Sequence, residues 1–180
     1  MKNVLIICGV EPHPTKPNTY SQTFVNNART YTAENPQDNV TVVDAANFVQ
    51  FDKPISEMFK VIRAQCQWNI PQVVIYSGHS SPQHLLVFAH CCEDVGHDER
   101  YIGQEFKWDM PFDENCKIIL WGCQTAGMKG EKQPDTIAQS IANTTGKRVY
   151  GFVWRTSQKM INKQYYQLPE HGDLVEVLPK

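Results

Sequence analysis

The segment Val73-Val74-Ile75-Tyr76-Ser77-Gly78-His79 is an apolar run that ends in a serine, a glycine and a histidine. An apolar run of this length, rich in β-branched residues, predicts a strand buried on both faces. A second run of the same kind, Ile118-Ile119-Leu120-Trp121-Gly122-Cys123, follows later in the chain and ends on a cysteine. Each run therefore places a chemically reactive side chain just beyond a predicted buried strand.

The rest of the chain alternates between similar runs and segments with helical spacing. Apolar runs at 4–8, 40–43 and 148–154 predict three further strands, and periodicity predicts helices over 21–33, 54–66 and 135–146. Such alternation is typical of a largely parallel sheet with helices on both faces. Residues 80–115 show no sustained period and are expected to be irregular, with Leu85 to Ala89 forming an extra strand or packing under a loop. We expect a loop over 124–134 and a weakly strand-like segment over 174–178.

Size and composition limit the class of protein. The chain has 180 residues, 41% of them apolar, and a formal net charge of -2. This length suits one domain, which we take to span residues 1–180. A nearly balanced charge argues against a general nucleic-acid-binding protein, which normally has a basic surface. The six cysteines occur in a context that does not look secreted, so no disulfide framework is indicated. No CxxC pair occurs among them, so a structural zinc site has little support.

The location of the protein can also be predicted. No stretch approaches the roughly 18 apolar residues of a membrane span. The apolar run near Met1 is too short for a signal peptide. We therefore expect a cytoplasmic protein that does not bind membranes. Delivery as an effector by a route that needs no N-terminal signal is an open alternative.

His79 and Cys123 follow the two buried runs, at the strand ends where parallel sheets bind their ligands. If the two strands are neighbours in the sheet, the imidazole and the thiol lie side by side. An imidazole beside a thiol activates the sulfur as a nucleophile, because it favours the thiolate or takes the proton. Backbone amides in the turns after the strands are suited to stabilise an oxyanion.

The order of these elements resembles the caspase-like (clan CD) cysteine peptidases, in which a catalytic His follows one buried strand and a catalytic Cys follows the next. In caspases the His precedes the Cys by about 50 residues, and here the two are 44 positions apart. The two strand-end motifs and the helix and strand over 137–149 look most like the bacterial members, which include self-processing protease domains of large toxins. The likeness covers roughly residues 3–155. It implies a caspase-like three-layer α/β/α fold with a mostly parallel central sheet.

The resemblance implies a role for each matching residue. Cys123 is expected to be the nucleophile and His79 the general acid or base, while the backbone amides of Ser80 and Cys123 hold the oxyanion. Caspases have a Gly after the His, whereas here Ser80 follows and Gly78 precedes it. Trp121 replaces a Gln or Glu that lines the specificity pocket of several relatives, so acidic or basic specificity does not transfer simply. The residues expected to bind substrate are Trp121, Trp154, Arg155 and Thr156 and, from the loop after the first strand, Glu11 and His13.

No cofactor and no metal are expected. A nucleotide-binding turn would need a GxGxxG or P-loop motif, and neither is present. The cluster of His, Cys, Asp and Glu residues over 84–99 matches no zinc or calcium loop, and the adjacent Cys91 and Cys92 are poorly placed to bind one ion. We interpret its polar residues as solvated.

The sequence therefore predicts a cysteine endopeptidase that acts on a protein or peptide substrate. One alternative is a catalytically inactive caspase-like module that binds a protein partner or a regulatory ligand. A second is a flavodoxin-like small-molecule binder, against which the missing phosphate loop counts. The oligomeric state is not predicted. Toxin-type relatives respond to inositol phosphates, for which a basic patch would have to come from Lys129, Lys132, Lys147, Arg148, Lys159 and Lys163.

Overall fold

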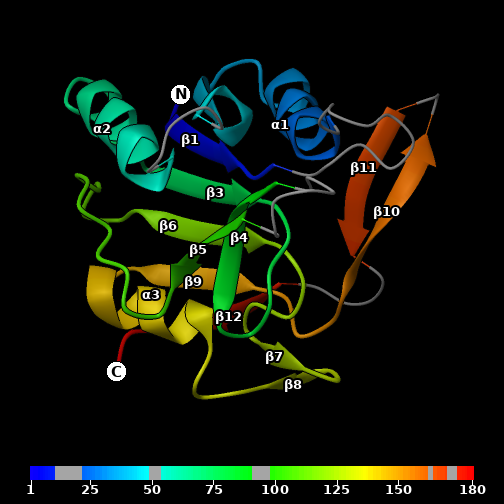
Figure 1. The fold of residues 1–180 in the computed structure, drawn as a ribbon. Coiled ribbons are helices and arrows are strands. Elements are labelled where there is room, and N and C mark those ends of the chain that lie inside the picture. Colours follow the sequence, from blue (N-terminus) through cyan, green and yellow to red (C-terminus); the bar gives the residue numbers. More distant parts are fainter. Residues whose placement is uncertain (11–21, 49–53, 91–97, 162–163, 170–173) are drawn as a thin grey trace.

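A six-stranded sheet forms the centre of the protein, in the strand order β12-β9-β6-β3-β1-β2 (Figure 1). The computed structural model describes residues 1–10, 22–48, 54–90, 98–161, 164–169 and 174–180. The sheet consists of β1 (Asn3–Cys8), β2 (Asn39–Asp44), β3 (Val73–Ser77), β6 (Lys117–Trp121), β9 (Arg148–Gly151) and β12 (Val175–Val177).

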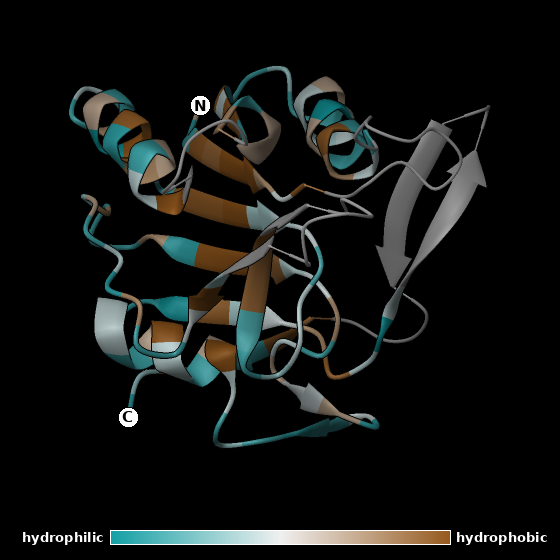
Figure 2. Ribbon diagram, viewed as in Figure 1, coloured by the Kyte–Doolittle hydropathy of each residue, from teal (hydrophilic) through white to brown (hydrophobic). Residues whose placement is uncertain are grey.

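All neighbouring strands from β2 to β9 pair in parallel, and only the edge strand β12 is antiparallel. Strands β1 and β3 are apolar almost without interruption because helices or other chain segments cover both of their faces. The hydropathy colouring of the central strands shows the same continuous apolar character (Figure 2). Parallel pairing places the carboxyl ends of these five strands at one edge of the sheet.

Helices cover both faces of the sheet, as the sequence predicted. Helix α1 (Thr23–Glu34) buries Phe24 and Ala28 against β1 and β3 on one face. Helices α2 (Pro54–Cys66) and α3 (Ile137–Thr145) pack on the opposite face, where they form the larger apolar core. The expectation of an α/β fold with a mostly parallel sheet and helices on both faces is confirmed. No helix in the described ranges is long and apolar enough to cross a membrane.

Hairpins are inserted where the sequence lacked a clear period. The segment expected to be irregular contains β4 (His84–His90) and β5 (Asp98–Gly103), an antiparallel pair that buries Leu85 and Ile102 in the larger core. The expected loop over 124–134 contains the short hairpin β7 (Gly127–Met128) and β8 (Glu131–Lys132). Beyond the sheet, β10 (Thr156–Ile161) and β11 (Gln164–Pro169) form a further hairpin (Figure 1).

Two predicted boundaries move for identifiable reasons. Helix α3 starts at Ile137 because Thr136 is its N-cap, with the Thr136 hydroxyl accepting from the Gln139 N–H at 3.3 Å. The strand expected over 148–154 ends at Gly151. The residues that follow leave the sheet and bond to the loop after β6 instead, for example through the Gln124 N–H to the Trp154 carbonyl at 3.0 Å.

Replacing a core side chain and an exposed one gives a test of this packing. Leu120 of β6 has no exposed surface, so Leu120→Ala is expected to lower the free energy of unfolding by about 2–5 kcal/mol. Trp68 is 82% exposed, and Trp68→Ala is expected to change the free energy of unfolding by less than about 0.5 kcal/mol. Urea unfolding of both variants measures the difference, and equal losses would contradict the described core.

Candidate active site

The turns that carry His79 and Cys123 follow neighbouring strands. Strands β3 and β6 pair in parallel, with Ser77 opposite Trp121, so His79 and Cys123 each lie two residues beyond the same rung. The ladder continues into the turns through the Gly78 N–H, which donates to the Trp121 carbonyl at 3.2 Å. The condition set by the sequence, that these two strands are adjacent, is therefore met.

A side-chain hydrogen bond ties the two turns together. The Ser80 hydroxyl donates to the carbonyl of Cys123 at 2.8 Å. The close approach depends on Gly122, because a Cβ at that position would lie 2.8 Å from the Gly78 carbonyl oxygen and 2.9 Å from Cβ of Ser80. The small residue before the cysteine is thus required by the packing of one turn against the other.

A buried tyrosine fixes the backbone of the histidine turn. The Tyr76 hydroxyl lies 2.5 Å from the His79 carbonyl oxygen and 2.7 Å from the Leu86 carbonyl oxygen, and its single proton is shared between these two acceptors. Burial raises the pKa of this phenol, so it remains a neutral donor. The Leu86 N–H also donates to the His79 carbonyl, at 2.9 Å. Two donors thereby hold the peptide group of the predicted general acid or base.

The His79 ring is supported by helix α1. Its centroid lies 5.2 Å from that of Phe24, with the two planes at 86°. This edge-to-face contact orients an imidazole that is otherwise half-buried.

The Cys123 sulfur contacts Thr156, the first residue of β10, through three polar groups of that residue. The sulfur lies 3.1 Å from the Thr156 hydroxyl and 3.4 Å from its carbonyl oxygen, and the Thr156 N–H donates to it at 3.3 Å. Within the described residues, the hydrogen bonds of this sulfur are all with Thr156. The His79 ring therefore shares the strand ends with the thiol without a direct hydrogen bond to it.

The two predicted oxyanion donors lie in these turns. Ser80 faces Leu85 in an antiparallel bridge that is closed by bonds from Leu86 to His79 and from Ser81 to His84. In such a pair the N–H of the bridged residue itself points away from its partner strand. The Ser80 N–H therefore points away from β4, as an oxyanion donor requires. The Cys123 N–H belongs to the adjoining turn.

The other cysteines with described surroundings differ from Cys123. Cys8, Cys66 and Cys116 are buried, whereas Cys123 is half-buried. Burial raises the pKa of all three of these thiols, that of Cys116 to about 12. Buried thiols with a raised pKa are poor nucleophiles, so Cys123 is the best placed of the four to react.

The predicted substrate-binding residues have different surroundings. Trp121 lies half-buried between the sheet and α1, beside a cavity of about 10 Å³ that Asn27 and Ser77 also line. Trp154 and Arg155 are exposed, and a Cβ on Gly130 would lie 2.7 Å from the Trp154 indole, which places that ring over the β7–β8 turn. Thr156 is 8% exposed and contacts the sulfur. Glu11 and His13 lie outside the described residues.

The six residues from which a basic patch would have to come have different surroundings. The Lys147 ammonium donates to the Glu114 carbonyl at 3.0 Å, and Arg148 lies 3.7 Å from the Glu176 carboxylate. The Lys132 ammonium donates to the Glu176 carbonyl at 2.7 Å. Lys129 is exposed on the β7–β8 turn. The side chains of Lys159 and Lys163 are outside the described set.

No group of three or more His, Cys, Asp or Glu side chains in the described part of the chain could hold a metal ion. The predicted solvated cluster over 84–99 is described only in part, and Cys91 and Cys92 lie outside the described residues.

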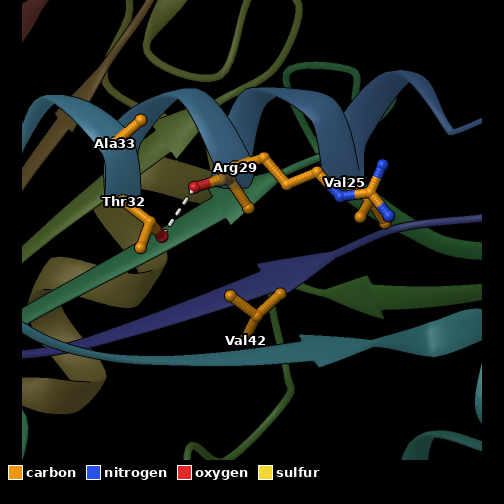
Figure 3. A pocket seen from close by; sticks show the side chains of 6 residues that line it. Val25, Arg29, Thr32, Ala33 and Val42 are labelled. Atoms are coloured by element: carbon orange, nitrogen blue, oxygen red, sulfur yellow. Dashed lines mark hydrogen bonds between the residues drawn. The ribbon is translucent and has the colours of Figure 1, made fainter.

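A second concave surface lies away from the predicted site. A groove of about 410 Å³ runs between α1 and the edge strand β2, lined by side chains that include Val25, Ala33 and Val42. Figure 3 shows Val42 facing the helix and Arg29 extended along it toward Val25. None of the residues predicted to act in catalysis lines this groove.

Sequence reasoning missed two features of the site. The apolar run predicted Tyr76 only as a residue of a buried strand, and an uninterrupted run does not signal that its hydroxyl reaches the next turn. The contact between Thr156 and the sulfur joins residues 33 positions apart, and no local pattern signals it.

Alanine substitutions at two glycines test the close approach of the turns. Gly122→Ala forces Cβ against Ser80 and the Gly78 carbonyl, so it is expected to lower the free energy of unfolding by about 1–3 kcal/mol. In Gly103→Ala the added Cβ would lie 3.7 Å from its nearest neighbour, an atom of the His84 ring. The free energy of unfolding is therefore expected to change by less than about 1 kcal/mol. Chemical denaturation compares the two, and a neutral Gly122→Ala would show that the turns are not in contact.

Comparisons with known proteins add no assignment. No model of a known protein family matches the chain, and no curated protein resembles it in sequence. The function proposed below therefore rests on the residues and geometry of this site.

Proposed function

We propose that the chain is a cysteine endopeptidase of the caspase-like type, with Cys123 as nucleophile and His79 as general acid and base. The observation that carries the proposal is the parallel pairing of β3 with β6, which puts both turns at the same rung and joins them through Ser80 and Cys123. A half-buried thiol and a half-buried imidazole at such an edge are the two groups that acyl transfer by a thiol needs.

The reaction follows from these two groups. The Cys123 thiolate attacks the carbonyl carbon of a peptide bond, and a carbon–sulfur bond forms. When the tetrahedral intermediate collapses, the carbon–nitrogen bond breaks and His79 gives a proton to the leaving amine. Water then attacks the thioester while His79 takes a proton from it. The carbon–sulfur bond breaks, which releases the acid and returns the Cys123 thiolate and the protonated His79 with which the cycle began.

A direct bond from His79 to the sulfur is not required for this chemistry. The imidazole must reach the leaving nitrogen, which lies beside the sulfur once the substrate is bound. A ring held by Phe24 at the neighbouring strand end is suited to that position. The outward-pointing Ser80 N–H and the Cys123 N–H are proposed to hold the oxyanion between the two turns.

One predicted substrate-binding residue offers an accessible surface. The cavity beside Trp121 has a volume of only about 10 Å³, which is about the space that one water needs. The ring of Trp154 is exposed and gives an apolar surface after β9. We propose a protein or peptide substrate in the cytoplasm, which contacts the Trp154 ring.

A second candidate function has its own support. The hydrogen bonds of the sulfur within the described residues are with Thr156, and none of them is with the His79 ring. This arrangement favours an inactive caspase-like module that binds a protein partner. The two functions differ in whether Cys123 reacts with a peptidyl chloromethyl ketone.

Three variants test the endopeptidase. Cleavage of a peptide library by the purified chain is expected to be abolished by Cys123→Ala, because the nucleophile is lost. For His79→Ala a loss of about 10²- to 10⁴-fold is expected, since proton transfer contributes that much. The control is His84→Ala, which removes an exposed ring tilted at 49° against Tyr101 and should leave cleavage within about two-fold of the parent. Undiminished turnover by Cys123→Ala would exclude the mechanism.

Alkylation by iodoacetamide tests the reactivity of the thiol separately from any substrate. Trypsin gives peptides over 118–129 and 108–117, which contain Cys123 and Cys116 respectively as their only cysteine. At pH 7.5 the first peptide is expected to be labelled at least ten times faster, because Cys116 is buried and its pKa is about 12. Mass spectrometry of the two peptides measures the ratio. Equal labelling, or faster labelling of Cys116, would count against Cys123 as a nucleophile.

A further inference from the structure

Thr156 presents three polar groups to one sulfur atom. Its N–H donates to Cys123 Sγ at 3.3 Å, its hydroxyl lies 3.1 Å away, and its carbonyl oxygen lies at 3.4 Å. Such convergence is unusual for a residue that the sequence suggested only as a lining of the substrate cleft.

The three groups respond differently when the thiol loses its proton. The N–H donates to either form, and the hydroxyl can turn so that its proton points at the sulfur. The carbonyl accepts only from the protonated thiol, so that contact is lost. Hydrogen bonds to an ionised partner are about twice as strong as those between neutral groups. Two donors and one acceptor therefore face the sulfur once it is ionised.

The donors are also fixed in place before any reaction. Thr156 is 8% exposed. Two residues earlier, the Trp154 carbonyl accepts from the Gln124 N–H at 3.0 Å, which anchors this segment to the turn of Cys123 itself. Thr156 is in addition paired with Pro169 in the β10–β11 ladder. Donors that are held in position stabilise a developing charge without reorganisation.

We infer that Thr156 is a positioning residue for the nucleophile, which holds the Cys123 sulfur and stabilises its thiolate through its N–H and its hydroxyl. The inference deepens the proposed endopeptidase and rests on it for its catalytic meaning. It divides the two tasks of the site, so that Thr156 favours ionisation of the sulfur and His79 handles the proton of the leaving group.

The test compares variants that differ in the hydroxyl alone. Thr156→Val keeps the branched shape and the N–H but removes the hydroxyl donor, whereas Thr156→Ser keeps the hydroxyl and removes a methyl group. The rate of iodoacetamide labelling of the 118–129 peptide is measured against pH in the full chain, with thermal unfolding recorded for each protein. Thr156→Ala offers the same loss of hydroxyl should the valine variant not fold.

In the valine variant, the pH at which the labelling rate is half of its maximum (the labelling midpoint) is expected to rise by about half to one pH unit. The labelling rate at pH 7 then falls roughly three- to ten-fold. Its labelling is expected to recover above the new midpoint, since the thiolate fraction is then restored. The serine variant should stay within two-fold of the parent at every pH. A purely structural role would lower stability without moving the midpoint.

The outcomes separate this inference from the proposed function. Superimposable pH profiles for the parent and Thr156→Val would overturn the role of Thr156, even if the parent cleaves peptides. A shifted midpoint in a chain that cleaves no peptide and resists peptidyl chloromethyl ketones would support the thiol–threonine coupling and reject the endopeptidase. With a cleavable peptide, the loss in Thr156→Val should fall on kcat and disappear at high pH.

Discussion

The parallel pairing of β3 with β6 is the constraint on which the candidate site depends. Each strand alone ends in a small residue and a reactive side chain, and neither turn has a function until the other lies next to it. The register that opposes Ser77 to Trp121 sets the two turns level. A shift by one residue would turn the side chains of β6 to the opposite face and break the Gly78 bond to Trp121.

Bringing two turns so close has a steric cost that the sequence meets with small residues. Gly122 leaves the space that Ser80 and the Gly78 carbonyl occupy, and Gly78 in turn leaves space for the Tyr76 ring. Ser80 is the next residue to fit into this space. Its hydroxyl ties the histidine turn to the Cys123 carbonyl. The contact between the two turns is therefore closed by a side-chain hydrogen bond.

How much could be predicted from the sequence depends on the range of each interaction. The strands and helices of the sheet were predictable because burial on two faces leaves long apolar runs, as in β1 and β3, and one-sided burial leaves a helical period, as in α2. In the β4–β5 hairpin, the apolar run from Leu85 to Ala89 suggested the first strand, as an extra strand or a segment under a loop, and β4 confirms the strand. Its pairing with β5 was not predicted, since the polar residues between them show no alternation. The contact between Thr156 and the Cys123 sulfur could not be predicted from the sequence at all. It depends on where the chain leaves β9, and that exit is fixed by backbone bonds to the loop after β6.

The distance between ring and sulfur is consequently a property of the tertiary structure and not of either turn. The His79 ring is oriented by Phe24 of α1, whereas the Cys123 sulfur is held by Thr156 at the start of β10. Strand β11, the partner of β10, lies against α1, so the two supports are linked through one hairpin. In the proposed endopeptidase, the substrate would bind between an imidazole held from the helix side and a thiol held from the hairpin side. An oxyanion bound by the Ser80 and Cys123 amides would complete that arrangement, because those amides belong to the two turns that the sheet has already brought together.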